Sequence, residues 1–221
     1  MVTQREIKLD DRLFTEKEII GRLVTVPEVM AELEKERLMM EESGGGVTFS
    51  GGEPLMQPRF LEEMLKACID SGFHTAVDTS GYALISDLES ILPYTSLFLY
   101  DLKMIDNPLH EQYTGVNNQI ILENFNWLMQ QGKPVRVRVP VVGGHTATAD
   151  NISGILELLL PFVEKISQVD LLPYHRIGMH KYDKLGIPCD MPGEEAKMSE
   201  PWFHSWKEKF EAKGFKVKIG G

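Results

Sequence analysis

Cysteine is scarce in this sequence, because only Cys68 and Cys189 occur among its 221 residues. Two cysteines so far apart form neither a disulfide framework nor the close spacing that is typical of metal ligands. Long apolar runs are also absent, so no membrane span is expected. The first 25 residues mix acidic and basic side chains without the apolar stretch of a secretory signal. We therefore expect the protein in the cytoplasm.

Clusters of lysine and arginine are missing as well. The chain has 23 basic and 33 acidic side chains and a formal net charge of −10. No basic patch is available to neutralise phosphates, so nucleic acid is not an expected partner. A hydrophobic fraction of 43% is enough for the core of one α/β domain. We expect residues 25–221 to form that single domain and residues 1–24, which show no sustained period, to be a connector that is partly disordered.

The most distinctive stretch is GGGVTFSGGEP at residues 44–54. Its β-branched and aromatic run predicts a buried strand, which opens into an exposed turn at Ser50, Gly51, Gly52 and Glu53. Because the two glycines lack Cβ atoms, a small ligand can lie directly on the backbone and meet its free N–H and C=O groups. The amino group of a free amino acid would suit such an edge, although a lone glycine pair would favour a plain turn.

Predicted strands alternate with predicted helices along the rest of the chain. The strands are expected through residues 47–49, 75–77, 97–100, 135–142, 169–172 and 216–219. The helices are expected over residues 25–43, 58–70, 86–92, 119–130, 152–163 and 202–210. Units of about 30 residues imply parallel strands joined by right-handed crossovers, either in a doubly wound sheet or in a barrel. Polar residues follow five of the strands, and a barrel would bring those strand ends to one mouth.

Asp101 and Lys103 lie two positions apart at a predicted strand end, so they point the same way if the extended conformation persists. The carboxylate can accept from ribose hydroxyls or help to hold a cation, and the ammonium can pair with a ligand carboxylate. A local ion pair on a loop is the alternative.

Three more polar residues follow predicted strands. Asp78 precedes Thr79, Ser80 and Gly81, so it could be only an Asx-turn residue. His175 could equally be a structural or a binding histidine. Arg138 lies inside an apolar strand, where an arginine needs a partner or a water-filled cavity. An anionic ligand or a peptide backbone would serve as that partner.

Six motifs resemble those of the radical S-adenosylmethionine (SAM) enzymes that activate glycyl radical enzymes, a family that includes pyruvate formate-lyase activating enzymes. In chain order they are GGGVTFSGGEP, AVDTSGYA, LYDLK, HEQYTG, VRVRVPVVGG and LLPYHRIGMHKYDKLG. The resemblance runs from about residue 25 to the end of the chain. It implies an α/β fold, a partial (β/α)6 TIM-like barrel of the radical SAM type, whose first strand and cluster loop are missing here.

The resemblance also implies a cofactor site. Ser50 and the Gly51-Gly52-Glu53 segment would bind the methionine end of S-adenosylmethionine, and Lys103 would bind its carboxylate. Asp101 and His175 would lie on the ribose or adenine side.

Two further roles follow from the same resemblance. Asp78 and Asp101 would hold a monovalent cation beside the cofactor. Arg138 would guide the glycine loop of the partner enzyme into the barrel, and with Lys103 it is a candidate catalytic residue.

The activity implied is that of an oxidoreductase of anaerobic metabolism. A reduced 4Fe-4S cluster, supplied with electrons by flavodoxin or ferredoxin, cleaves S-adenosylmethionine to a 5′-deoxyadenosyl radical that takes a hydrogen atom from a glycine of the partner. The family holds this cluster with three closely spaced cysteines. Cys68 and Cys189 cannot supply three thiolates. We therefore expect a truncated chain that lacks the cluster and is inactive on its own.

Two alternatives remain at this point. One is a cluster-free barrel enzyme that uses Lys103 for Schiff-base or proton-transfer chemistry, with Asp78 or Asp101 as its acid-base partner. The other is a non-catalytic protein that keeps the cofactor pocket or the face that docks to the glycyl radical enzyme.

Overall fold

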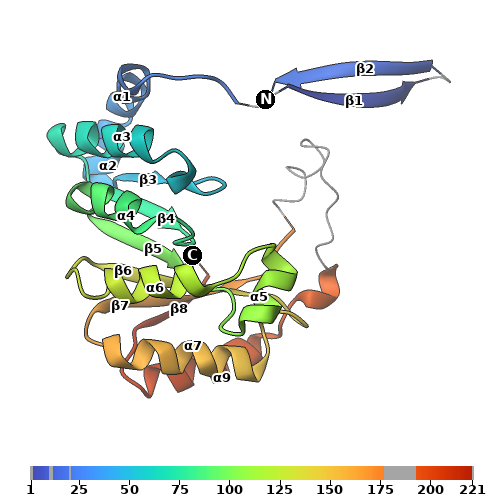
Figure 1. The fold of residues 1–221 in the computed structure, drawn as a ribbon, viewed down its shortest axis with the longest axis vertical. Coiled ribbons are helices and arrows are strands. Elements are labelled where there is room, and N and C mark those ends of the chain that lie inside the picture. The colour runs from blue at the N-terminus through green and yellow to red at the C-terminus, as the bar shows by residue number, and fades with distance from the viewer. Residues whose placement is uncertain (1, 10–11, 20, 177–192, 221) are drawn as a thin grey trace.

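The computed structural model describes residues 2–9, 12–19, 21–176 and 193–220. Six parallel strands form one sheet in the order β3-β4-β5-β6-β7-β8, so each strand pairs with the next strand in the chain (Figure 1). The strands are β3 Val47–Phe49, β4 Thr75–Thr79, β5 Leu97–Asp101, β6 Val135–Val141, β7 Ile166–Pro173 and β8 Val217–Ile219. All six strand predictions are confirmed, with small shifts at the ends.

Helices alternate with the strands as the sequence predicts, and α5 is an additional helix that was not predicted. They are α1 Val26–Lys35, α2 Arg37–Ser43, α3 Pro58–Asp70, α4 Ile85–Ile91, α5 Asn107–Thr114, α6 Gln119–Leu128, α7 Ala149–Leu159 and α9 Glu200–Glu211. No helix in the described part of the chain is long and apolar enough to cross a membrane. The helix predicted over residues 25–43 is divided into α1 and α2, because the helical conformation is interrupted at Glu36.

A two-stranded hairpin occupies most of the segment that we expected to be an irregular connector. β1 Val2–Leu9 pairs antiparallel with β2 Arg12–Ile19, in a sheet separate from the six-stranded one. The segment expected to be a connector thus contains two strands, although its sequence shows no sustained period. Most residues of both strands are polar. The sequence therefore lacks the alternation of apolar and polar residues by which a half-buried strand is predicted.

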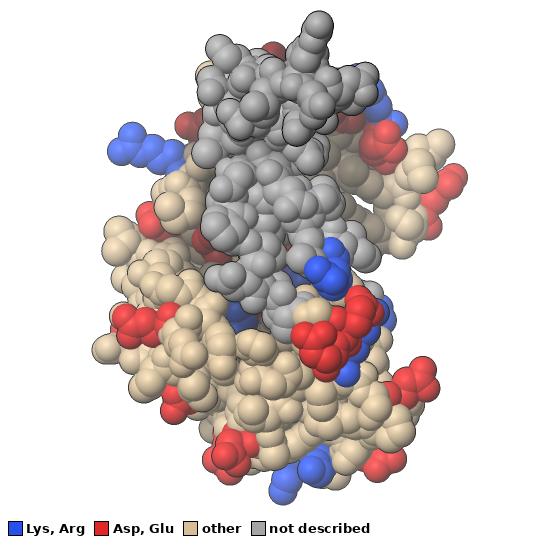
Figure 2. All heavy atoms as spheres, turned by 90° about the vertical axis from the view of Figure 1, so that its right-hand side faces the viewer, with Lys and Arg blue, Asp and Glu red and all other residues tan. Residues whose placement is uncertain are grey.

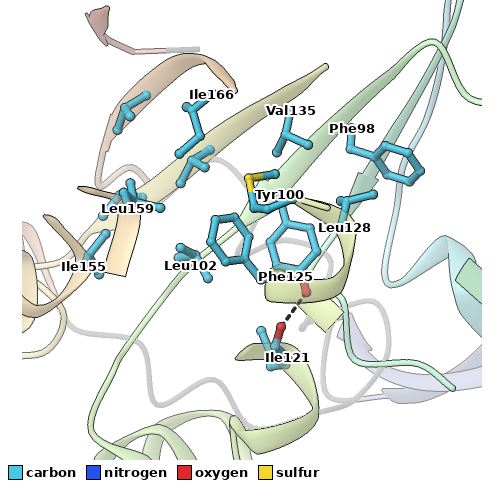
Figure 3. Packing of buried hydrophobic residues seen from close by; sticks show 14 of the residues in the cluster. Phe98, Tyr100, Leu102, Ile121, Phe125, Leu128, Val135, Ile155, Leu159 and Ile166 are labelled. Atoms are coloured by element: carbon cyan, nitrogen blue, oxygen red, sulfur yellow. Dashed lines mark hydrogen bonds between the residues drawn. The ribbon is translucent and has the colours of Figure 1, made fainter. Parts of the chain in front are cut away.

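The main core lies between the sheet and the helices that pack on its outer face. On β6, the side chains of Val135, Val137, Val139 and Val141 are fully buried there. Figure 3 shows the ring of Tyr100 of β5 beside that of Phe125, with the Tyr100 hydroxyl donating a hydrogen bond to the carbonyl of Ile121 at 2.7 Å. Burying one such large apolar side chain stabilises the fold by about 2 kcal/mol.

The inner face of the sheet is polar, because side chains alternate along each strand. Arg136 and Arg138 alternate with the buried valines of β6. On β7 the register shifts by one residue near Val135, so Gln168 and Asp170 lie opposite Arg136 and Arg138. The sheet therefore carries a row of charged side chains on the face away from the helices.

Candidate functional site

The loop after β3 lies where the strands of the sheet have their carboxyl ends, and two of its residues are glycines with an exposed backbone. Gly51 and Gly52 have φ angles of 97° and 57°, which non-glycine residues rarely adopt. Both residues are exposed, and no heavy atom lies within 4 Å of where a Cβ would be at either position. The turn predicted from the sequence is present, with room for a ligand against its backbone.

Glu53 closes this loop with its carboxylate. Its Oε1 accepts from the backbone N–H of Leu55 at 3.2 Å and from the hydroxyl of Thr79 at 2.7 Å. Its Oε2 accepts from the backbone N–H and the hydroxyl of Ser80, at 2.9 and 2.7 Å. A side chain of the loop after β3 thus holds the loop after β4.

Asp78 and Asp101 share one arginine. Nη1 of Arg138 lies 2.5 Å from Oδ1 of Asp78, and its Nε lies 3.5 Å from Oδ1 of Asp101. The other oxygen of Asp78 accepts from the hydroxyl of Ser50 at 3.0 Å. Three neighbouring strands and the loop after β3 therefore bring their polar side chains to one place.

The ionisation of these groups reflects both burial and pairing. Burial raises the pKa of Asp101 to about 6, while Arg138 and Lys103 oppose that rise and Asp78 adds to it. Burial works against the guanidinium of Arg138, but Asp101, Asp78 and Asp170 together raise the pKa of Arg138 above its usual value. Oδ1 of Asp101 is buried and accepts no hydrogen bond from the residues that the structure describes.

Burial alternates from Asp101 to Met104, because Asp101 and Lys103 are partly exposed whereas Leu102 and Met104 are buried. Lys103 is half-buried. Its carbonyl accepts from the side-chain amide of Asn151 at 2.9 Å, so α7 fixes the position of this loop.

A row of alternating charges continues from the site across the sheet. In the strand register, Asp101 lies opposite Arg138, Arg138 opposite Asp170, and Asp170 opposite Lys218. Asp170 is buried, accepts from the amide of Gln168 and lies 3.8 Å from Nε of Arg136. The sequence analysis did not single out Asp170, because the bulge that turns it inward is not visible in the residue pattern.

Three buried asparagines were also missed, and they bind the backbone of the loops around the site. Asn124 donates to the carbonyls of Gly81 and Ala83. Asn118 and Asn151 both hold the loop after β5, and Asn151 also donates to the loop after β6. Asn118 precedes α6 as its N-cap residue, whereas Asn124 and Asn151 lie inside helices among buried apolar residues. An asparagine usually indicates a cap or a turn, so nothing in the sequence indicated that these side chains bind neighbouring loops.

The structure brings together the predicted residues Ser50, Glu53, Asp78, Asp101 and Arg138. Lys103 lies close enough to Asp101 to lower its pKa. His175 follows β7 at the same edge of the sheet and is exposed. Figure 2 shows the molecule from the side of this edge, with acidic and basic side chains next to one another on the surface.

The residues of this chain do not fit a 4Fe-4S cluster held by three thiolates. Cys68 is fully buried in α3, with its Sγ 3.8 Å from the sulfur of Met30, and burial raises its pKa to about 11. Cys189 lies outside the described residues. Among the described residues no group of three or more histidine, cysteine or acidic side chains is placed to hold a metal ion.

The known proteins that resemble this chain in sequence belong to one group of enzymes. The radical SAM superfamily matches residues 7–159. The trans-4-hydroxy-L-proline dehydratase activating enzyme of Clostridioides difficile is 40% identical over 93% of this chain and 68% of its own length. The pyruvate formate-lyase-activating enzyme of Clostridium pasteurianum is 35% identical over 81% of this chain and 75% of its own length.

This chain covers a smaller share of some other relatives. The choline trimethylamine-lyase activating enzyme of Oleidesulfovibrio alaskensis is 39% identical over 80% of this chain, which covers 58% of that protein. The chain thus spans about half to three quarters of the lengths of such curated relatives.

Solved structures agree with the fold. A domain of a pyruvate-formate lyase-activating enzyme from Bacteroides vulgatus superposes with a TM-score of 0.67 at 33% identity, covering 80% of this chain and 99% of that one. A radical SAM methyltransferase from Sphaerobacter thermophilus, with a TM-score of 0.66 and 16% identity over 89% of this chain and 57% of that one, shares the fold alone. The α/β fold with a six-stranded parallel sheet is therefore that of the partial TIM barrels of radical SAM proteins.

Proposed function

Because this chain belongs to the radical SAM superfamily, among the activating enzymes of glycyl radical enzymes, we propose that the carboxyl edge of its sheet is a pocket for S-adenosylmethionine. The observation that carries the proposal is the exposed backbone of Gly51 and Gly52 beside a cluster of three charged side chains, Asp78, Asp101 and Arg138, from β4, β5 and β6. The ligand has an amino group, a carboxylate and two ribose hydroxyls, and the site offers a partner for each.

The roles divide according to the geometry. The backbone of Gly51, Gly52 and Glu53, with Ser50 beside it, would accept the amino group, and the ammonium of Lys103 would meet the carboxylate. Asp101 would accept from a ribose hydroxyl, with His175 on the same side of the ligand. Oδ1 of Asp101 supports this assignment, because it is buried, accepts no hydrogen bond from the described residues and has only the ion pair with Arg138 at 3.5 Å, so it could still accept from a ligand hydroxyl.

A monovalent cation between Asp78 and Asp101 is a further part of the proposal. Both carboxylates already lie within 4 Å of one positive group, the guanidinium of Arg138. A monovalent cation would therefore take the place of that guanidinium between the two carboxylates. The same Arg138 would turn to the backbone of the partner's glycine loop when that loop enters the site.

S-adenosylmethionine supplies the radical chemistry of this family when it is bound, and the described residues would bind it, orient it and exclude water. We propose that the full activity is formation of a glycyl radical on a partner enzyme, with a reduced flavodoxin or ferredoxin as electron donor. The presence of only two cysteines favours a second candidate for this chain by itself, a protein that binds the cofactor without cleaving it.

Titration calorimetry with S-adenosylmethionine tests the pocket. The native chain should bind the ligand, and Lys103→Met should bind it at least about tenfold more weakly, because a charge-assisted bond to the carboxylate is lost. Lys66→Met, which removes a half-buried lysine of α3 that pairs with Glu62, is the matched control and should bind like the native chain. Failure of the native chain to bind, or equal binding by Lys103→Met, would overturn the proposal.

A further inference from the structure

Glu53 joins two loops that are far apart in the chain. Its carboxylate accepts four hydrogen bonds, one from Leu55 and three from Thr79 at the end of β4 and Ser80 in the loop that follows. An ionised carboxylate has about four lone-pair sites, so this arrangement leaves little capacity for a further donor such as the amino group of a ligand.

We propose that Glu53 is a positioning residue, whose carboxylate holds the loop after β3 against the loop after β4 and so presents the backbone of Gly51 and Gly52 to the ligand. In this arrangement the side chain of Glu53 does not bind the ligand itself. The inference rests on the proposed function for the identity of the ligand, but the clamp between the two loops is a property of the protein alone.

The glycine pair needs such a clamp. Gly51 and Gly52 have no side chains, and no heavy atom packs where their Cβ atoms would be. Glycine loses more backbone entropy on ordering than any other residue. A fixed ligand-binding conformation therefore has to be imposed from the flanking residues.

Both flanks of the pair are tied to the same neighbouring segment. On one side the hydroxyl of Ser50 donates to Asp78 at 3.0 Å, and on the other side Glu53 accepts from Thr79 and Ser80. The glycines thus lie between two ties that both end on residues 78–80. This arrangement fixes the position of the turn although its own residues contact almost nothing.

The segment that receives these ties is itself held firmly. The hydroxyl of Thr79 accepts from the backbone N–H of Gly81 at 2.9 Å, and the carbonyl of Gly81 accepts from Asn124 at 2.8 Å. A Cβ at Gly81 would lie only 1.7 Å from the hydroxyl of Tyr100, so this turn packs directly on the core. The clamp therefore connects the turn at Gly51 and Gly52 to a segment that hydrogen bonds and core packing hold in place.

The test compares two variants that break the clamp from opposite ends. Glu53→Gln places an amide NH2 against donors and loses two of the four bonds, whereas Ser80→Ala removes only one hydroxyl donor and leaves Glu53 in place. Ser80→Thr keeps the hydroxyl and is the matched control. Calorimetry uses S-adenosylmethionine and 5′-methylthioadenosine, which has the same nucleoside but no amino acid group.

We expect Glu53→Gln to weaken S-adenosylmethionine binding about tenfold and Ser80→Ala about threefold, with the double variant no weaker than Glu53→Gln alone. Ser80→Thr should bind like the native chain, and no variant should change the affinity for 5′-methylthioadenosine. A loss in Glu53→Gln without any loss in Ser80→Ala would show direct contact with the ligand. Equal losses for both ligands would show general damage to the fold, and either result overturns the inference.

Amide hydrogen exchange tests the clamp without any ligand. The N–H of Ser80 donates to Glu53, so its exchange should be at least about tenfold faster in Glu53→Ala, which removes both acceptor oxygens, and unchanged in Ser80→Thr. Unchanged exchange in Glu53→Ala overturns the clamp. If the native chain binds no S-adenosylmethionine, the proposed function fails, while the exchange data still decide whether the two loops are joined by Glu53.

Discussion

At the scale of single residues, the site is a set of charges that neutralise one another before any ligand arrives. Arg138 lies between Asp78 and Asp101, and Asp170 lies on its other side in the strand register. The sequence predicted the first three as polar residues at strand ends. It could not predict that they pair with each other, because pairing depends on the order of strands in the sheet and on their register.

The raised pKa of Asp101 gives the protein a specific pH dependence. A folded pKa of about 6, above the ordinary value of 3.8, means that the folded chain binds this proton more tightly than the unfolded chain does. The free energy of unfolding should therefore fall by on the order of 3 kcal/mol as the pH rises through the interval from 3.8 to about 6, and level off above it.

Urea denaturation of the native chain and of Asp101→Asn at a series of pH values measures this effect. The asparagine cannot titrate, so the stability of Asp101→Asn relative to the native chain should increase with pH over the same interval. Identical pH profiles for the two proteins would contradict a raised pKa at Asp101.

At the scale of helices and strands, most elements follow from local signals. The helix over Pro58–Asp70 is found where its apolar stripe predicts it. The helix that was missed, Asn107–Thr114, has almost no apolar stripe and buries only His110. It forms because the Asp106 side chain caps its first turn and Gly115 ends it, two signals that are visible in the sequence but were not used.

Substitutions at two glycines with similar backbone angles allow the cost of backbone strain to be measured separately from the cost of steric overlap. Gly81 and Gly72 have φ angles of 74° and 79°, but only Gly81 faces another side chain, the ring of Tyr100. Gly72→Ala should therefore cost about 1 kcal/mol from the left-handed backbone alone. Gly81→Ala should cost at least about 3 kcal/mol, because a methyl group would overlap the buried tyrosine.

Thermal and urea unfolding of the two variants measure these costs. Similar losses in both would show that Tyr100 does not pack against the turn. Such a result would also remove the rigid support on which the clamp at Glu53 depends.

At the scale of the whole molecule, the alternation of strands and helices predicted a parallel sheet, and the polar strand ends correctly predicted convergence at one edge. What the sequence could not reveal was the inner face of that sheet. The bulge near Val135 turns Gln168 and Asp170 inward, and its hydrogen bond from the Ser167 hydroxyl to the carbonyl of Val135 joins residues 32 positions apart. The residue pattern within one strand cannot indicate a hydrogen-bond partner in another strand.

The cysteine content makes a prediction for the whole chain. After anaerobic reconstitution with iron and sulfide, these 221 residues should hold far less than the four irons of one cluster per chain. Two cysteines cannot supply three thiolates, and Cys68 is fully buried in α3. Iron analysis and visible absorption measure the outcome, with the Clostridium pasteurianum activating enzyme treated in parallel. A brown protein with four irons per chain would contradict the prediction.

The most direct test of the account is a crystal structure of this chain with S-adenosylmethionine. The account predicts the amino nitrogen of the ligand at about 3 Å from the backbone of Gly51 or Gly52, and its carboxylate beside the ammonium of Lys103. The carboxylate of Glu53 should keep its bonds to Thr79 and Ser80 in the complex. A ligand bound elsewhere, or no ligand at a concentration that saturates relatives, would contradict the claim that this edge of the sheet is the cofactor pocket.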